Sequence, residues 1–330
     1  MEKTKVGIVG GSGYIGSALA SKLSQKHGVK IIDLKEPKLN IENTEFYKCN
    51  IINYDDVKSA LSDVDVIIHT AIIQIPYINE NKRLGYDVNF IGTQNICRAV
   101  EEVPSIKGLI LSGTWHVFGE RDLTGVIDES FGFRPDKVEK RARLYAFSKI
   151  AQEIIVRYYN EMSEKVYGVI RLGTVLGKGM PEKTAANIFI SRGLKGESIT
   201  PYKHSMYRPM LYVDLNDVCN IFGIFVNKII SKEIAKNNNS LDNIVNIYWP
   251  KPLTIYDLAL LIRNSIIENT EGKIIPEIDV VDFGEPMLFN ENDKNLMRID
   301  QTRINHFLDN VELTDPKNTI NKLIKDRINN

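Results

Sequence analysis

The residues "VGIVGGSGYIGSALA" (6–20) decide the fold of this chain. An apolar run typical of a buried strand ends at Gly10, and a helical pattern begins near Tyr14. Glycine allows a tight turn and lets a helix pack closely on a strand. The N-terminus of the helix supplies backbone N–H donors and the positive end of a dipole. The stretch therefore predicts a strand–turn–helix unit that binds a phosphate group.

The first half of the chain repeats this alternation of strand and helix. Short apolar runs, which read as buried strands, stand at residues 5–10, 29–34, 64–71, 107–113 and 166–173. Amphipathic stretches separate them, so we predict a Rossmann-type α/β fold with a doubly wound parallel sheet. After about residue 175 the rhythm loosens. We expect residues 1–175 to form the dinucleotide-binding domain, with return segments near 208–250, and residues 176–330 to form mainly a smaller C-terminal substrate lobe.

Composition excludes several classes of protein. Of 330 residues, 43% are apolar and 25% charged, a balance typical of globular proteins. The 42 basic residues equal the 42 acidic ones, so no net basic field favours nucleic acid. The sequence has neither an apolar run of membrane-spanning length nor a signal-peptide pattern at its N-terminus. Three scattered cysteines indicate neither a metal site nor a disulfide framework, so we expect a cytoplasmic protein without a metal.

The glycine turn and one acidic residue predict the cofactor. The turn matches Gly-x-Gly-x-x-Gly from Gly11. Asp33 ends the second strand, where a carboxylate accepts hydrogen bonds from the adenosine ribose and repels a 2′-phosphate. We therefore predict NAD, although Lys35 nearby leaves NADP open. The residues expected to contact the cofactor within the turn are Gly10, Gly13, Tyr14, Ile15 and Gly16.

Further motifs follow in a fixed order. They are "DVNFIGTQNI" (87–96), "LILSGTWHVFG" (109–119), "YAFSK" (145–149), "RLGTVLG" (171–177) and "RPMLYVDLNDV" (208–218). Together with the glycine turn, this series resembles the extended short-chain dehydrogenases/reductases of the NAD-dependent, sugar-nucleotide epimerase and dehydratase kind. The resemblance implies a small-molecule sugar or sugar nucleotide as substrate. It also implies a homodimer formed through helices near 92–103 and 148–162.

The resemblance assigns a catalytic trio to Thr114, Tyr145 and Lys149. A Tyr and a Lys four residues apart share one face of a helix, which by itself is common on ordinary helices. By resemblance, Thr114 hydrogen-bonds the substrate oxygen and Tyr145 exchanges a proton with it. Lys149 holds the nicotinamide ribose and favours the phenolate, because a nearby positive charge lowers a tyrosine pKa.

Other positions carried over from the family are less specific. Asn50, followed by Ile51, lies where relatives have an Asp near the adenine, and a carbonyl oxygen of Asn can accept the same hydrogen bond. Ala71 belongs to the backbone that lines the cofactor. Asn89 is as readily explained by bracing a neighbouring strand as by any other role. Arg208 aligns with an Arg that contacts phosphate in relatives, and an ion pair is the alternative.

The sequence also departs from the family. Trp115 and His116 stand where sugar-nucleotide dehydratases carry Asp-Glu, so a 4,6-dehydratase is not expected. His116 is similar to a His in uronate dehydrogenases and is a candidate substrate contact; packing with Trp115 and Phe118 is the simpler alternative. His69 is expected to satisfy backbone groups at a strand end. The extra residues "DKVEKRAR" (136–143) are expected to form a solvated helical insertion, and a position at the mouth of the substrate site is the alternative.

Three functions remain open at this point. The first is an NAD-dependent epimerase, which oxidises a ring hydroxyl of a sugar nucleotide and returns the hydride to the other face. The second is a dehydrogenase that acts on a free sugar or uronic acid and releases NADH. The third, from another class, is a non-catalytic dinucleotide-binding protein on the same fold. The presence of all three residues of the trio favours an enzyme.

Overall fold

The computed structural model describes residues 4–234, 239–307 and 312–329. Contacts divide the chain into two compact units. Unit 1 comprises Met1–Gly119, Gly132–Arg171 and Cys219–Asn246, and unit 2 comprises Glu120–Phe131, Leu172–Val218 and Ile247–Asn330. The contact boundaries near 171, 218 and 246 fall close to the predicted change at 175 and the predicted return segments. The roles that we predict for the two parts stay predictions.

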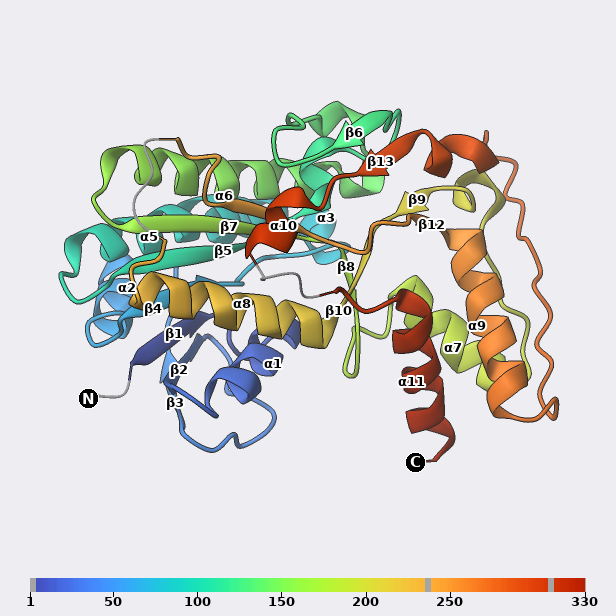
Figure 1. Ribbon diagram of the computed structural model, residues 1–330, viewed down its shortest axis with the longest axis horizontal. Helices are drawn as coiled ribbons and strands as arrows, with labels where there is room; N and C mark the ends of the chain where they lie inside the picture. Colours follow the sequence, from blue (N-terminus) through green and yellow to red (C-terminus); the bar gives the residue numbers. More distant parts are fainter. Residues whose placement is uncertain (1–3, 235–238, 308–311, 330) are drawn as a thin grey trace. The chain divides into compact units, whose positions relative to one another are not determined.

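Unit 1 contains a seven-stranded sheet in the order β11-β7-β5-β4-β1-β2-β3 (Figure 1). Its strands are β1 (Lys5–Val9), β2 (Gly28–Asp33), β3 (Thr44–Lys48), β4 (Val66–His69), β5 (Gly108–Thr114), β7 (Val166–Leu172) and β11 (Ile244–Ile247). The pairings of β1 with β2 and β4, of β2 with β3, and of β4 with β5 are parallel. The predicted Rossmann-type fold is confirmed.

Helices cover both faces of this sheet (Figure 1). They are α1 (Tyr14–Leu23), α2 (Tyr54–Ala60), α3 (Tyr77–Glu80), α4 (Lys82–Tyr86), the π-helix η1 (Asp87–Gly92), α5 (Thr93–Glu102), α6 (Arg143–Met162) and α8 (Leu215–Ile230), of which α8 begins in unit 2. Tyr167 and Val169 of β7 join the core beneath α2, α5 and α6. Gly168, between them, faces α8, where a Cβ atom would lie 2.4 Å from Phe225 Cζ. Large side chains on one face of β7 and a glycine on the other thus let helices pack closely against both faces of the strand.

Unit 2 consists of short paired strands and helices. Its strands are β6 (Gly125–Ile127), β8 (Thr174–Leu176), β9 (Pro209–Met210), β10 (Tyr212–Asp214), β12 (Leu253–Thr254) and β13 (Met297–Ile299), and its helices are α7 (Ala185–Leu194), α9 (Ile255–Asn269), α10 (Thr302–Phe307) and α11 (Pro316–Ile328). Strand β8 pairs with β10, β9 with β12, and β6 with β13. Thr254 and Asp257 form a capping box at the start of α9, because each side chain accepts a hydrogen bond from the other's backbone N–H.

The predicted solvated helix at 136–143 is wrong. The segment forms two 3₁₀ turns, Pro135–Lys137 and Lys140–Ala142. Val138 and Ala142 are buried, in one cluster with Ala146 of α6 and Ile75. Two apolar residues among charged ones therefore anchor this segment, whereas the pattern of charges suggested exposure. No helix within the described residues is long and apolar enough to cross a membrane. The predicted compartment stays a prediction.

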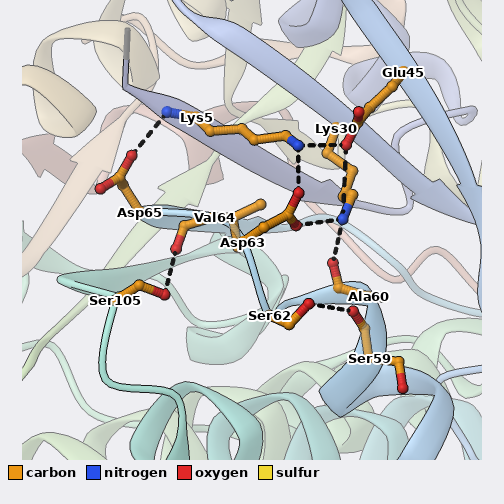
Figure 2. Close-up of polar contacts among 10 residues, drawn as sticks. All are labelled: Lys5, Lys30, Glu45, Ser59, Ala60, Ser62, Asp63, Val64, Asp65 and Ser105. Carbon is orange, nitrogen blue, oxygen red and sulfur yellow. Dashed lines mark hydrogen bonds and ion pairs between the residues drawn. The ribbon is translucent and has the colours of Figure 1, made fainter. Parts of the chain in front are cut away.

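An ion-pair network joins β1, β2 and β3 to the turn before β4 (Figure 2). The Lys30 ammonium is almost buried; it donates to Asp63 and, over 3.1 Å, to the carbonyl oxygen of Ala60. Lys5 also pairs with Asp63, and its ammonium lies 2.6 Å from a Glu45 oxygen. Burial raises the pKa of Asp63, but the hydrogen bonds from both lysines outweigh it, so the pKa lies below its ordinary value.

We expect Asp63→Asn to destabilise the protein by about 1 kcal/mol near neutral pH, since the carboxylate is half exposed and its charge is partly screened. The lowered pKa means that the contribution is present above the ordinary pKa of an aspartate and is lost as the pH falls through the folded-state value. Urea unfolding at several pH values checks this. A variant of an exposed aspartate in unit 2, Asp279→Asn, is the control. A difference from wild type that stays constant down to acid pH would contradict it.

Candidate functional site

The glycine turn lies against the end of β4. Gly10 has a φ of +82°, and a Cβ atom there would lie 2.5 Å from the Ala71 backbone nitrogen. A Cβ atom on Gly16 would lie 2.2 Å from the Gly10 carbonyl oxygen. Both positions therefore require glycine. The turn thus brings Gly10 to the main chain of Ala71, and the contacts predicted between these residues and the cofactor stay predictions.

Helix α1 begins without a cap. Gly13 is its N-cap residue, no side chain caps the first turn, and no acidic residue lies in that turn. The first-turn N–H groups of Ile15 and Gly16 and the positive helix end are thus left for an anionic ligand, and the contact predicted for Tyr14 stays a prediction. The cradle of glycine backbone and the uncapped helix fit a dinucleotide pyrophosphate.

Asp33 is held at the end of β2. One carboxylate oxygen accepts a hydrogen bond from the Ser12 backbone N–H at 3.1 Å and the other from the Lys35 N–H at 3.2 Å. Each oxygen keeps further lone pairs that can accept from ribose hydroxyls. Lys35, whose positive side chain kept NADP as an alternative, contacts Asp33 through its backbone N–H and so helps to orient the carboxylate.

Asn50 and Ile51 follow β3. The Asn50 side-chain oxygen accepts a hydrogen bond from the Ile52 N–H at 3.2 Å, which uses one of its two lone pairs. The Ile51 side chain is buried in the core. Any cofactor contact of Ile51 therefore falls to its main chain, and both assignments stay predictions.

The predicted catalytic trio comes from β5 and α6 of unit 1. Thr114 is the last residue of β5 and is buried. Its side chain hydrogen-bonds with Tyr145 of α6. One turn further along α6, the buried Lys149 ammonium donates to the Ser112 carbonyl oxygen of β5 over 2.8 Å. Both members of the Tyr–Lys pair are thus tied to the same strand end, which the spacing of the pair alone did not decide.

Burial sets the ionisation of the pair. It raises the pKa of Tyr145 to about 12, and the hydrogen bond with Thr114 opposes this. It lowers the pKa of Lys149 to about 7. The protein alone therefore favours a neutral phenol, and a positive charge beside Tyr145 is required before it can act as a base near neutral pH.

His116 lies beside the trio. Its Nδ1 atom is 3.2 Å from Thr114 Oγ1, and its ring meets the Tyr145 ring edge-on with centroids 5.6 Å apart. Trp115, completely buried, supplies the packing beneath the turn, with its ring 6.2 Å from that of Phe118. His116 packs on Trp115, with ring centroids 4.4 Å apart, and remains partly exposed, so the packing alternative is observed and a substrate contact stays a prediction.

A polar cluster beneath α6 was not expected from the sequence. His69 is completely buried, and its Nε2 atom lies 2.9 Å from Thr93 Oγ1 rather than at a backbone group, so the expectation for His69 is wrong. Gln152 reaches Thr93 Oγ1 at 2.9 Å and the Ala71 carbonyl oxygen at 3.3 Å. Asn89 pairs with the N–H and the carbonyl of Ile73, so it braces the segment that follows β4 and not a strand itself. The signal for Gln152 was its position three residues after Lys149.

Arg208 is described within unit 2. Its guanidinium lies 3.8 Å from a carboxylate oxygen of Glu120, which is buried. The alternative of an ion pair is thus observed, and a phosphate contact stays a prediction. Among the described residues, no three His, Cys, Asp or Glu side chains form a group that could hold a metal ion.

We expect Lys149→Met to stabilise the cofactor-free protein below about pH 7. A folded-state pKa of about 7, below the ordinary value, means that the unfolded chain binds more protons between about pH 7 and pH 10, so the cost of burying the ammonium fades as pH rises. Melting temperatures near pH 6 and pH 9.5 check this, with the exposed Lys26→Met as control. A gain that does not shrink with pH would contradict it.

Comparison with known proteins supplies the family. The family model described as the NAD dependent epimerase/dehydratase family matches residues 6–236. A Methanocaldococcus jannaschii protein, provisionally named UDP-glucose 4-epimerase, is 29% identical over 272 residues, which cover 78% of this chain and 81% of that protein. D-erythronate dehydrogenase of Haemophilus influenzae is 29% identical over 199 residues, 57% of this chain and 60% of that protein.

A solved structure agrees in fold. The crystal structure of Thermus thermophilus UDP-glucose 4-epimerase in complex with NAD superposes with a TM-score of 0.76 at 19% identity, and the match covers 98% of this chain and 99% of that one. The glycine cradle, the uncapped α1 and Asp33 fit the cofactor of that structure. The chain belongs to the NAD-dependent epimerase/dehydratase family, and its cofactor is NAD.

Proposed function

We propose that this protein is an NAD-dependent epimerase of a sugar nucleotide. The observation that carries the proposal is the trio at the end of β5, where Thr114 hydrogen-bonds with Tyr145 and Lys149 is fixed to the Ser112 carbonyl. A catalytically silent relative would not need a buried ammonium one turn from a phenol in this arrangement, because burying that charge is costly. The similarity to the M. jannaschii protein supports the same reading.

The residues divide the work as follows. NAD, when bound, supplies the hydride chemistry at the sugar carbon. Thr114 holds the sugar oxygen by a hydrogen bond, and Tyr145 accepts the proton of the sugar hydroxyl. Because burial alone holds the pKa of Tyr145 at about 12, the Lys149 ammonium would favour the phenolate only together with the positive charge that NAD brings when bound. For epimerisation Tyr145 returns the proton to the same oxygen after the keto sugar has turned its other face to the cofactor, so the cofactor leaves the cycle unchanged.

A dehydrogenase of a free sugar or uronic acid is the second candidate. Two observations favour it: the positive charge of Arg208 is paired with the buried Glu120, and His116 stands beside Thr114 and Tyr145 where it can hydrogen-bond a small polar substrate. A relative named D-erythronate dehydrogenase also acts on a free sugar acid, as its name states. In this reaction NADH and a proton are released in step with oxidised product.

One experiment separates the two reactions. The protein is incubated with NAD and a panel of sugar nucleotides and free sugar acids, absorbance at 340 nm is followed, and the sugars are read by NMR. Isomerised sugar without net NADH supports the epimerase. NADH that rises in step with the loss of a sugar acid supports the dehydrogenase. No turnover of any member, with NAD bound, would count against both.

We predict that Tyr145→Phe lowers turnover by at least about 100-fold, because the general acid–base group is lost. NAD affinity should stay within a few-fold of wild type, since the ring and its edge contact with His116 remain. Tyr158→Phe, on the same helix and 68% exposed, is the matched control and should keep full activity. Activity that survives Tyr145→Phe would remove the assignment.

The predicted homodimer is part of this proposal. Helix α6 exposes four large apolar side chains along its length: Phe147, Ile154, Tyr158 and Met162. Their spacing of seven, four and four residues places Ile154, Tyr158 and Met162 on one face. The neighbouring α5 exposes the Arg98–Glu102 ion pair instead. A second copy that covers the α6 stripe would remove this apolar surface from water.

We expect the double variant Ile154→Glu with Tyr158→Glu to elute as a monomer, and the wild type to have twice the 37.5 kDa chain mass by light scattering. Charges placed on the stripe oppose its burial. Phe283→Glu, at an exposed apolar position in unit 2, is the control and should leave the mass unchanged. A monomeric wild type would contradict the proposal.

A further inference from the structure

The polar cluster beneath α6 determines the tautomer of His69. Thr93 Oγ1 lies 2.8 Å from the Asn89 carbonyl oxygen. Because a carbonyl oxygen can only accept, the hydroxyl donates its one proton to it. The Ala71 carbonyl oxygen can also only accept, so the Gln152 atom beside it is the NH₂ group. That group also donates to Thr93 Oγ1. Thr93 Oγ1, its proton used, accepts from Gln152 and from His69.

His69 therefore carries its proton on Nε2. The 2.9 Å contact with Thr93 Oγ1 is a hydrogen bond donated by His69, and the 3.3 Å separation of His69 Nε2 from Gln152 Nε2 is a contact between two donors. Nδ1 then bears a lone pair. This atom is buried, and no hydrogen-bond partner for it lies within the described residues. A buried acceptor without a donor is costly, so its position calls for an explanation.

Lys149 is the nearby cation that this acceptor can face: the structure shows no hydrogen bond between them, but the Lys149 charge acts on the imidazole. Its ammonium has three protons, and the structure shows one of them directed to the Ser112 carbonyl oxygen. Ser112 follows Leu111, the residue paired with His69 between β4 and β5, and Gln152 lies one turn beyond Lys149 on α6. Burial and the Lys149 charge lower the pKa of His69 to about 3. The imidazole is thus neutral at any working pH, and the ammonium lies close enough to act on it.

We propose that His69 is a positioning residue for Lys149: the cluster formed by Asn89, Thr93 and Gln152 holds the imidazole with its Nδ1 lone pair directed to the Lys149 ammonium, and so keeps that ammonium charged and oriented. The Nδ1 side of a neutral imidazole is the negative end of its dipole, and a negative potential at the ammonium favours its charged form, here against the cost of burial. The proposal rests on the proposed role of Lys149 at the nicotinamide ribose and beside Tyr145. Under this proposal the Lys149 ammonium is stabilised by two residues, Ser112 of β5 and His69 of β4.

Thr93 and Gln152, which contact His69, do not titrate; Lys149, whose charge acts on the imidazole, does, and Tyr145 lies one turn before it on α6. A change at His69 should therefore be felt as a change in the pH at which Lys149 loses its proton.

Two substitutions separate this role from a structural one. In His69→Asn, an amide atom stands as many bonds from Cα as Nδ1 does, so the acceptor toward Lys149 can be kept and the bond to Thr93 is lost. In His69→Gln, the amide nitrogen replaces Nε2, so the bond to Thr93 is kept and the Nδ1 acceptor is lost. Neither substitution introduces a charge, and the melting temperature and circular dichroism of each show whether it folds.

The measurement is NAD affinity as a function of pH, which needs no sugar substrate. We expect affinity to fall as Lys149 loses its proton, and this fall to begin about one pH unit lower in His69→Gln, a roughly tenfold loss on that limb, but not in His69→Asn. In the Lys149→Met background, His69→Gln should have no further effect on the pH dependence. The reverse order, with His69→Asn shifted and His69→Gln normal, would overturn the proposal, as would two unshifted profiles.

A second readout is independent of NAD. In protein with ¹⁵N-labelled histidine, the resonances lost in His69→Gln should show a protonated Nε2 and an unprotonated Nδ1 that do not titrate above about pH 5. The Nδ1 resonance should move in Lys149→Met. An Nδ1 resonance of His69 that has the same chemical shift in Lys149→Met as in the wild type would overturn the proposal. If instead Lys149→Met leaves the pH dependence of NAD binding unchanged, the proposed role of Lys149 fails and not the tautomer of His69.

Discussion

The site depends on one buried hydrogen bond, from the Lys149 ammonium to the Ser112 carbonyl oxygen. It ties α6 to the end of β5 and brings Tyr145 to Thr114. The bond holds a charge where burial opposes it, and the pKa of Lys149 falls to about 7 as a result. With this pKa, Lys149 can change its charge near neutral pH. Acceptors directed toward the ammonium are needed to keep it protonated.

The parallel sheet explains why the separate parts of the site meet. Gly10, Asp33, Ala71 and Thr114 follow or end β1, β2, β4 and β5. Because these strands run in the same direction, their carboxyl ends lie along one edge, where ligands of such sheets bind. The ion pairs of Lys5 and Lys30 lie toward the opposite ends of β1 and β2, so the charges that tie the strands together are kept apart from the charges that serve the ligand.

Several features could be predicted because they depend on near neighbours in the chain. The apolar runs and the glycine turn are local patterns, and the structure confirms both. The prediction for residues 136–143 failed because charge density is a poor guide when two apolar residues of the segment meet Ile75, far away in the sequence. The partner of His69 was missed for the same reason, since Thr93 lies on another element.

The sequence by itself determined the fold class, the family and the glycine turn with Asp33, and it singled out Thr114, Tyr145 and Lys149 as candidates for catalysis. The tertiary structure alone decided how deeply Lys149 is buried, that His69 meets Thr93, and that Arg208 meets Glu120. The physical reason is that backbone preferences are set by residues a few positions apart. Ionisation and hydrogen-bond direction are set by burial and by partners that only folding brings together.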